Sequence, residues 1–252
     1  METYSHSKLS TFEKCPLKYK YRYIDKIISL RETIEVVLGK AVHETLEWLY
    51  KEIKKNKIPA IDEVIINYSK NWGRNYHSEI LIVRDGLTAE DYFNKGVQFL
   101  LSYYTEHRPF DDNTLELEKE IKVIIDENGE YQIRGFIDRL SYNLKTGEYE
   151  IHDYKTSNNL PDKDSIDDDK QLALYSIAIK EEFGKEKDIC LIWHYLNFNK
   201  KICIRKTTEQ LERLKKETLE LIKKIESTKE FNPNKSALCN WCEYKIMCPV
   251  WN

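Results

Sequence analysis

The chain has 252 residues, of which 41% are hydrophobic and 33% charged, and its 40 basic and 43 acidic residues give a formal net charge of −3. No segment approaches the roughly 18 consecutive apolar residues of a membrane span, and the first ten residues lack the charged start and apolar run of a secretory signal. The totals therefore argue against a membrane protein. They favour a cytoplasmic globular protein, in which any nucleic-acid surface is local.

The first 110 residues have helical periodicity. Apolar residues recur at roughly helical spacing over residues 8–25, where Pro16 predicts a boundary or kink next to Cys15. Further amphipathic helices are predicted over residues 39–55, 61–77 and 88–107. The last of these begins with Thr88, and Asp91 three residues later makes a pattern similar to a capping box.

Near Asn113 the hydrophobic period changes toward two, which indicates strands. The predicted strands cover residues 115–125, 131–142, 149–156, 188–196 and 201–206, and the remaining predicted helices cover residues 167–183 and 209–229. This mixed order predicts an α/β fold in one domain, residues 1–252. Its parts are a helical N-terminal part (1–110), a sheet core (111–207) and a C-terminal helix with a cysteine-containing tail (208–252).

Two aspartates and a lysine carry the clearest chemical signal. Asp138 lies on the second predicted strand, and Asp153 and Lys155 lie on the third, after a turn that can bring the two strands side by side. Side chains alternate across a strand, so Asp153 and Lys155 point to the same face. Carboxylates are preferred ligands of Mg²⁺ and Mn²⁺, and a lysine beside such an ion can orient the water that attacks a phosphodiester. A surface hairpin with scattered charges is the alternative interpretation.

Three further residues can complete this site. Gln171 and Tyr175 share one face of the predicted helix 167–183, from which both can hydrogen-bond a phosphate or a backbone carbonyl. His43 lies on the predicted helix 39–55, and as a metal ligand it would favour Mn²⁺ as well as Mg²⁺, since imidazole suits transition metals. Each residue also has an ordinary structural interpretation. Gln171 can be a helix cap, Tyr175 a tyrosine on an amphipathic helix and His43 a partly buried structural histidine.

The cysteines indicate a second site. The tail contains a C-x2-C-x5-C run made of Cys239, Cys242 and Cys248. Clustered cysteines in a cytosolic chain indicate metal binding more than disulfides. Cys15 is the remaining cysteine outside the predicted strands, which makes it the candidate fourth ligand of an iron–sulfur cluster or of a zinc ion. Cys190 and Cys203 fall in apolar strands, where we expect them to pack in the core.

Basic and aromatic residues are interleaved in the N-terminal segment 12–23. The candidate DNA-binding residues there are Lys14, Lys18, Lys20, Arg22, Tyr19 and Tyr23. Basic groups can follow a phosphate backbone while aromatic rings stack on bases. A solvated helix face with aromatic packing beneath it explains the same pattern equally well.

Taken together, these motifs resemble the PD-(D/E)XK nuclease superfamily. They are most similar to its RecB-like branch with an iron–sulfur cluster, which includes the CRISPR-associated exonucleases and the nuclease domain of the AddB helicase–nuclease subunit. The matching stretches, in chain order, are FEKCPLKYKYRYI, GKAVHETLE, GFIDRL, IHDYKTS, QLALY and the closing cysteine run. The chain departs from the branch in having Asp153 where Glu is frequent. It also lacks the proline of the superfamily name before Asp138, which is usual for this branch.

The resemblance implies a restriction-endonuclease-like core, that is, a central mixed β-sheet flanked by helices. The implied ligands of Mg²⁺ or Mn²⁺ are His43, Asp138, Asp153 and the main-chain carbonyl of Tyr154. Lys155 would position the attacking water, with Gln171 and Tyr175 supporting the site. The implied ligands of a [4Fe–4S] cluster are Cys15, Cys239, Cys242 and Cys248.

The resulting hypothesis is a metal-dependent DNA nuclease, an exonuclease acting on single-stranded ends, with a structural [4Fe–4S] cluster that joins the two ends of the chain. The alternative is a DNA-end-binding adaptor subunit of a CRISPR-adaptation or helicase–nuclease complex with little activity of its own. Zn²⁺ is the alternative at the four cysteines. The sequence contains no G-x-x-x-x-G-K-[ST] motif, so these residues include no helicase motor.

Overall fold

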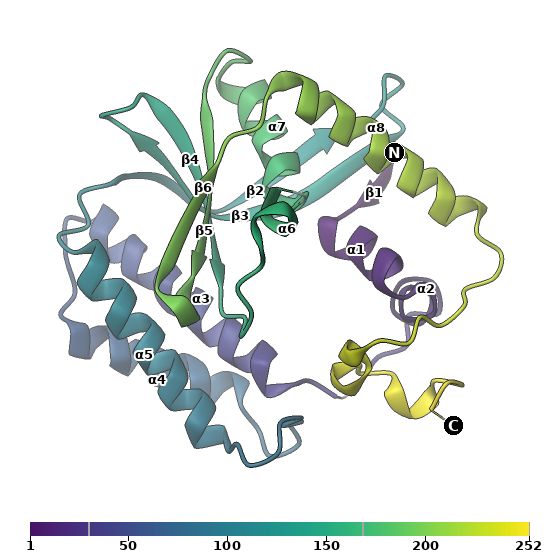
Figure 1. The fold of residues 1–252 in the computed structure, drawn as a ribbon. Helices are drawn as coiled ribbons and strands as arrows, with labels where there is room; N and C mark the ends of the chain where they lie inside the picture. Colours follow the sequence, from purple (N-terminus) through teal and green to yellow (C-terminus); the bar gives the residue numbers. More distant parts are fainter. Residues whose placement is uncertain (30, 168, 252) are drawn as a thin grey trace.

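The computed structural model describes residues 1–29, 31–167 and 169–251. This part of the chain forms a mixed six-stranded sheet with helices packed on both faces, as the sequence predicts (Figure 1). The strands are β1 (Glu2–Tyr4), β2 (Asn113–Ile124), β3 (Tyr131–Asn143), β4 (Glu148–Lys155), β5 (Ile189–Tyr195) and β6 (Lys200–Ile204). The α-helices are α1 (His6–Lys14), α2 (Pro16–Tyr19), α3 (Ile34–Lys54), α4 (Ile61–Asn75), α5 (Ala89–His107), α6 (Lys163–Asp167), α7 (Gln171–Phe183) and α8 (Thr208–Ser227). Shorter helical segments are η1 (Lys20–Ile24), η2 (Leu196–Phe198), η3 (Ala237–Trp241) and η4 (Lys245–Met247).

Strand β3 has one edge paired along almost its whole length and one interrupted edge. On the first edge, β2 runs antiparallel to it along residues 132–142. On the second edge, β1 is parallel to residues 131–133, and β4 is antiparallel to residues 139–143. Within the described ranges, positions 134–138 therefore have no strand partner on this second edge. We call this interval the sheet gap.

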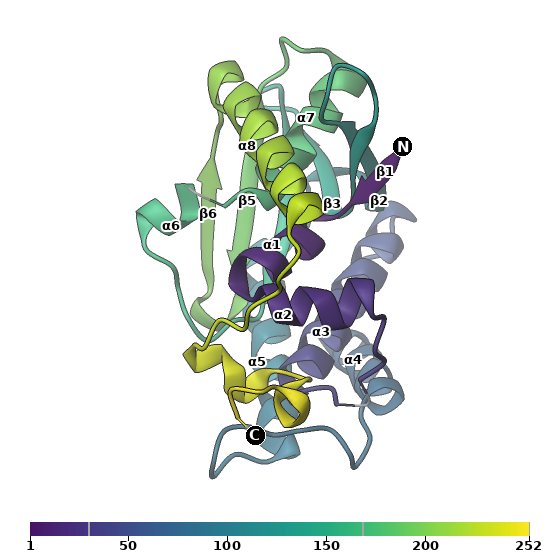
Figure 2. The ribbon, with the colours of Figure 1, turned by 90° about the vertical axis from the view of Figure 1, so that its right-hand side faces the viewer.

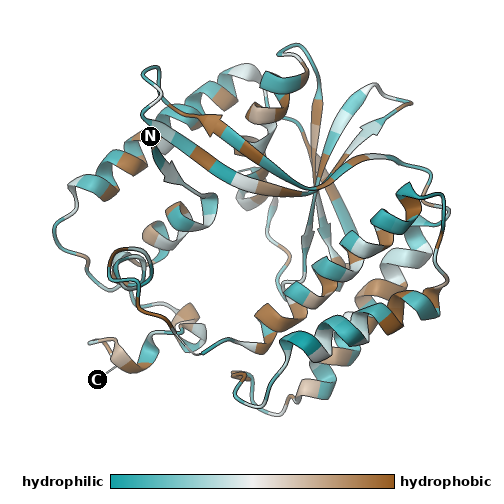
Figure 3. Ribbon diagram, turned by 180° about the vertical axis from the view of Figure 1, so that it is seen from behind, coloured by the Kyte–Doolittle hydropathy of each residue, from teal (hydrophilic) through white to brown (hydrophobic). Residues whose placement is uncertain are grey.

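Hydrophobic side chains pack on both faces of the sheet. On one face, α7 and α8 cover a buried cluster that includes Ile137, Ile151 and Leu174. On the other face, α3, α4 and α5 enclose a second cluster, to which Leu46 and Tyr103 belong. Figure 2 shows the C-terminal segment beside α1 and α2. Figure 3 shows hydrophobic residues interrupted by hydrophilic ones along helices and strands, the pattern expected where one side of each element is buried.

The local signals place most helix ends within a few residues. α5 begins after Thr88, whose side chain and that of Asp91 form the predicted capping box. The predicted boundary at Pro16 is confirmed, since α1 ends at Lys14 and α2 begins at Pro16. In the part of the chain that the structure describes, no helix combines the length and apolar character that crossing a bilayer requires.

The predicted helix 167–183 is wrong in its first turn. α6 ends at Asp167, and α7 begins only at Gln171. Asp168 lies outside the described residues. The Asp169 carboxylate accepts a hydrogen bond from the Gln171 N–H at 2.9 Å, so a local side-chain contact replaces a helical one at the start of α7.

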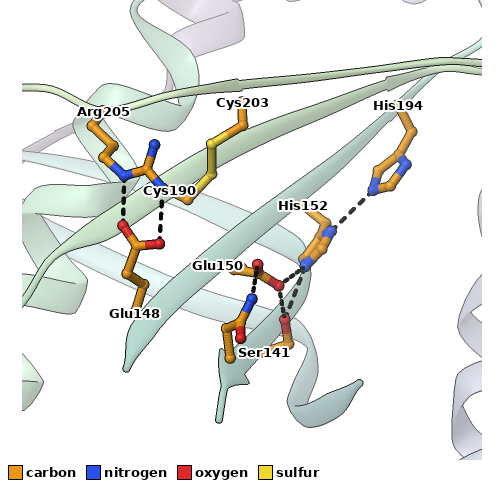
Figure 4. The surroundings of a disulfide bond; sticks show 9 residues. Ser141, Glu148, Glu150, His152, Cys190, His194, Cys203 and Arg205 are labelled. Carbon is orange, nitrogen blue, oxygen red and sulfur yellow. Dashed lines mark hydrogen bonds and ion pairs between the residues drawn. A yellow bond between two sulfur atoms is a disulfide. The ribbon is translucent and has the colours of Figure 1, made fainter. Parts of the chain in front are cut away.

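The expectation that Cys190 and Cys203 both pack in the core is also wrong. Cys190 is buried on β5, but Cys203 is exposed on β6, and the two form a disulfide (Figure 4). β6 pairs with β5 alone within the described residues, so it is an edge strand, and one of its faces meets solvent. The apolar composition of β6 could not reveal which face that is.

Candidate active site

Asp138 and Asp153 meet at the border of the sheet gap. The pairing of β3 with β4 stops at Arg139 opposite His152, and each aspartate is the next residue on its strand. The N–H of Tyr154 donates to Asp138 Oδ2 at 3.0 Å. The carboxylate thus satisfies a main-chain donor that would otherwise pair with the neighbouring strand. The end of the strand pairing explains why two carboxylates can converge here.

His43 reaches the same place from α3. Its Nδ1 lies 3.3 Å from Asp138 Oδ2, and its Nε2 lies 2.7 Å from the main-chain oxygen of Tyr154. Three of the four groups implied as metal ligands are therefore in direct contact: the imidazole, the Asp138 carboxylate and the Tyr154 carbonyl. Asp153 adds the fourth group from the residue next to Tyr154.

Lys155 connects the aspartates to α7. Its Nζ lies 2.8 Å from Asp153 Oδ2 and donates to Gln171 Oε1 at 3.1 Å. Tyr175, one turn further along α7, is buried and lies across β3 at Gly135. A Cβ on Gly135 would be 2.4 Å from the Tyr175 ring, so only glycine permits this close approach. Gln171 and Tyr175 therefore both face the site, as their spacing predicts.

Burial and neighbouring charges act together on the ionisable groups of the site. Burial raises the pKa of the Asp153 carboxyl, against the opposing effect of the Lys155 ammonium. Burial by itself lowers the pKa of Lys155 and of His43, but the nearby carboxylates raise both pKa values by more. Asp153 raises the pKa of Lys155 above its ordinary value, and Asp138 raises the pKa of the His43 imidazole to about 9. The carboxylates thus favour cations at this buried position.

The donor set fits Mg²⁺ or Mn²⁺. Asp153 is 4% exposed, and its Oδ2 has no hydrogen bond, although it is in ionic contact with Lys155. A buried oxygen without a hydrogen bond is costly, and a divalent cation would satisfy it. Carboxylate and carbonyl oxygens suit both ions, and imidazole suits Mn²⁺. Across residues 1–29, 31–167 and 169–251, no three His, Cys, Asp or Glu side chains already form a metal cage, and His43 Nε2 instead contacts the Tyr154 carbonyl.

A buried polar network that the sequence did not reveal lies behind the two aspartates. Its centre is Arg139, which is 1% exposed. The guanidinium donates to the Tyr154 hydroxyl at 3.1 Å and to His152 Nδ1 at 2.9 Å, and it forms an ion pair with Asp112. It also lies 4.1 Å from the centroid of the Tyr50 ring. The residues adjacent to Asp138 and Asp153 in the chain are therefore tied together within the core.

His152 extends this network to β5. Its Nε2 lies 2.9 Å from Ser141 Oγ, and its Nδ1 lies 2.9 Å from His194 Nε2 (Figure 4). Burial lowers the pKa of both histidines well below the ordinary value, and the Arg139 charge acts in the same direction. Both rings are therefore neutral near pH 7, which leaves them free to accept hydrogen bonds.

Glu118 on β2 is a further acidic residue that sequence reasoning missed. Its backbone has a φ of 48°. It lies opposite Asp138, between the paired positions 117–139 and 119–137 of β2 and β3. Desolvation raises the pKa of its carboxyl to about 7, and the charges of Asp138 and Glu47 act in the same direction. No local motif marks Glu118, because its relation to Asp138 depends on the strand register.

The four cysteines of the proposed cluster line one cavity of about 480 Å³. Cys15 comes from the junction of α1 and α2, and the other three come from the C-terminal segment around η3 and η4. Main-chain N–H groups donate to two of the sulfurs, from Asn234 to Cys15 at 3.5 Å and from Ser236 to Cys239 at 3.4 Å. Lys155 and Gln171 line the same cavity, so the cysteines and the candidate active site share it.

The basic residues of segment 12–23 mostly have partners within the protein. Lys18 and Arg22 both pair with Glu243 of the C-terminal segment, at 2.7 and 2.5 Å. Lys20 pairs with Asp25. Lys14 lines the cysteine cavity. These contacts hold the two ends of the chain together, so a DNA-binding role for these side chains would require that they exchange partners.

The expectation that Tyr19 stacks on a base is wrong. Tyr19 is 3% exposed, and its ring is stacked on Phe231 with an interplanar angle of 4°. Tyr23 is half-buried and packs against Tyr19. The aromatic half of the pattern in this segment therefore forms core packing, because the helix turns these rings inward under the C-terminal segment.

Comparison with known proteins supports the same family. A family model described as the PD-(D/E)XK nuclease superfamily matches residues 3–249. A solved structure titled "Crystal structure of SSO0001" has 17% sequence identity, and the match covers 94% of this chain and 95% of that one. Its TM-score of 0.38 is too low to carry an argument. None of the curated proteins matches the chain.

Proposed function

The chain belongs to the PD-(D/E)XK nuclease superfamily, and on that premise we propose that it is a metal-dependent deoxyribonuclease acting on single-stranded DNA ends. Members of this superfamily typically use Mg²⁺ or Mn²⁺. The observation that carries the proposal is the convergence of Asp138, Asp153 and Lys155 where β3 and β4 separate, with His43 against them. We place this activity in the cytoplasm.

The chain's own side chains would divide the work of phosphodiester hydrolysis. A bound Mg²⁺ or Mn²⁺ would neutralise phosphate charge and activate a water. Asp138, Asp153, His43 and the Tyr154 carbonyl would hold the ion. The Lys155 ammonium, held by Asp153 and Gln171, would orient the attacking water and stabilise negative charge on it. Burial of Asp153 excludes bulk water from this contact and so strengthens it.

The test is digestion of end-labelled single- and double-stranded DNA, with and without Mn²⁺. Asp153→Ala and Lys155→Ala should each reduce cleavage by about a thousandfold, the scale of losing a group that stabilises the transition state. Circular dichroism should show an unchanged fold. Lys185→Ala, at an exposed position in the loop before β5, is the matched control. Full metal-dependent activity of either active-site variant would contradict the assignment.

We further propose that the four cysteines hold a structural [4Fe–4S] cluster. The support is their arrangement around one cavity, with main-chain donors to two of the sulfurs. Anaerobically purified protein should be brown and absorb near ~400 nm. Colourless protein that contains one zinc per chain would instead assign Zn²⁺ to these residues.

The same digest tests the adaptor alternative. Protein that binds single-stranded DNA but never cuts it, with Mn²⁺ supplied, would point to an end-binding subunit of a CRISPR-adaptation or helicase–nuclease complex. The convergence of carboxylates and lysine favours the enzyme.

A further inference from the structure

A second cavity, of about 580 Å³, opens beside the sheet gap. Residues 3–8, at the end of β1 and the start of α1, form one wall, and residues 134–136 of β3 form another. Gln171 and Tyr175 of α7 complete the lining. This volume lies within the roughly 300–1,000 Å³ of sites that hold small ligands. The cavity exists because β1 leaves β3 after residue 133, while β4 joins it only at residue 139.

Phe136 lines this cavity with an exposed aromatic ring that has one cation beside it and a second cation on the opposite wall. Its side chain is 46% exposed, and the Arg134 guanidinium lies 5.5 Å from the ring centroid. Arg134 Nε donates to Glu120 at 2.7 Å, which fixes the guanidinium beside the ring. Lys8 lies on the other wall, 4.0 Å from the centroid of the Tyr4 ring. An exposed ring in a groove that also carries basic groups is the combination by which proteins bind single-stranded nucleic acid.

The cavity adjoins the candidate active site. Gln171 lines it and also accepts the hydrogen bond from Lys155. Phe136 precedes Asp138 by two residues on β3, which separates their Cα atoms by about 7 Å in an extended strand. A group resting on Phe136 would therefore be close to a phosphate held at Asp138.

We propose that Phe136 is the stacking platform of a nucleotide subsite, which holds an unpaired base next to the cleaved bond of a single-stranded DNA substrate. This inference rests on the proposed nuclease function. Arg134 and Lys8 attract the adjacent phosphates. A base inside a duplex is already stacked on its neighbours and cannot lie on Phe136. The subsite therefore selects single strands, and it does so without reading sequence, since every base has a face that can stack.

The walls of the cavity favour a nucleotide over a peptide strand added to β3. The interrupted edge is only five residues long, and β1 and β4 close it at its two ends. A stacked base needs only the Phe136 face and the open volume beside it.

The test measures binding of a short fluorescein-labelled single-stranded oligothymidine to the full chain by anisotropy, with EDTA present so that no cleavage occurs. Phe136→Ala should weaken binding about tenfold, within the range for loss of one stacking ring. Phe136→Trp should retain the affinity. Phe198→Ala is the matched control, because Phe198 is a similarly exposed phenylalanine (41%) between β5 and β6, and it should leave binding unchanged.

An oligonucleotide of abasic residues separates stacking from a structural effect. With it, wild type and Phe136→Ala should bind equally. The inference would be overturned if these two proteins bound oligothymidine with equal affinity. It would also be overturned if Phe136→Ala lowered the affinity for both oligonucleotides by the same factor. If the wild-type protein cleaves DNA but Phe136→Ala binds oligothymidine as tightly as wild type, the subsite alone is refuted. If the wild-type protein does not cleave DNA, yet Phe136→Ala weakens binding of oligothymidine and not of the abasic oligonucleotide, the nuclease proposal alone is refuted.

Discussion

The two candidate sites are held by different kinds of structure. Asp138 and Asp153 continue directly from paired strands, and the buried Arg139 network ties the neighbouring residues together in the core. The cysteines instead lie in short helical segments and loops. Polar contacts with the N-terminal part of the chain hold this region, chiefly those of Glu243 with Lys18 and Arg22.

The difference indicates what each region contributes. The geometry of the active site belongs to the sheet, so it should depend on the core. The cysteine segment closes over α1 and α2, so it should hold the two ends of the chain together. A direct link between the two regions is Trp241 Nε1, which donates at 3.1 Å to Glu35 near the start of α3, the helix that carries His43. Variants in each region can therefore test how independent the two sites are.

The largest effect on stability is expected at Arg139. Arg139→Met leaves Asp112 and the Tyr154 hydroxyl without their buried partner, which should cost about 3–5 kcal/mol. For a chain of this size, that lowers the melting temperature by at least about 6 °C. Calorimetry measures the change, with the exposed Arg213→Met on α8 as the control. Melting of Arg139→Met at the wild-type temperature would show that the network does not support the sheet.

A smaller effect is expected from the cysteine segment. Cys242→Ser should destabilise the chain by at least about 2 kcal/mol, since loss of a metal site is among the more costly changes. At temperatures below its lowered melting temperature, the Cys242→Ser variant should still cleave DNA in the presence of metal, because the sheet still positions Asp153 and Lys155. Met247→Ser, at an exposed position in the same segment (43%), is the control in calorimetry and limited proteolysis. If Cys242→Ser is no less stable than this control, the four cysteines have no structural role of their own.

The smallest effect is expected at the link between the regions. Trp241→Phe removes one hydrogen bond to Glu35, worth about 1 kcal/mol, or about 2–4 °C in melting temperature. Trp251→Phe is the control, since that ring contacts Lys235 and Lys245 instead. Cleavage rates that fall in Trp241→Phe while stability changes little would show that the cysteine segment influences α3. Unchanged rates would establish that the two sites act independently.

The sequence by itself determined the elements and the main chemical groups. Periodicity and caps are local properties, so α4, α5 and α8 and strands β2 to β6 were predicted within about two residues, whereas α3 begins five residues before its predicted start. Alternation along β4 placed Asp153 and Lys155 together, and helical spacing placed Gln171 and Tyr175 on one face. The contact of Lys155 with both Asp153 and Gln171 agrees with that reasoning.

The tertiary structure alone decided how those elements leave a gap. β1 has three residues, too few to show a period, yet its short pairing with β3 leaves positions 134–138 open beside Asp138. Burial of Tyr19, exposure of Cys203 and the approach of Glu118 to Asp138 likewise depend on segments far apart in the chain. A sequence pattern reports which side of an element is apolar. Which neighbour covers that side, and where no neighbour does, follows only from how the whole chain packs.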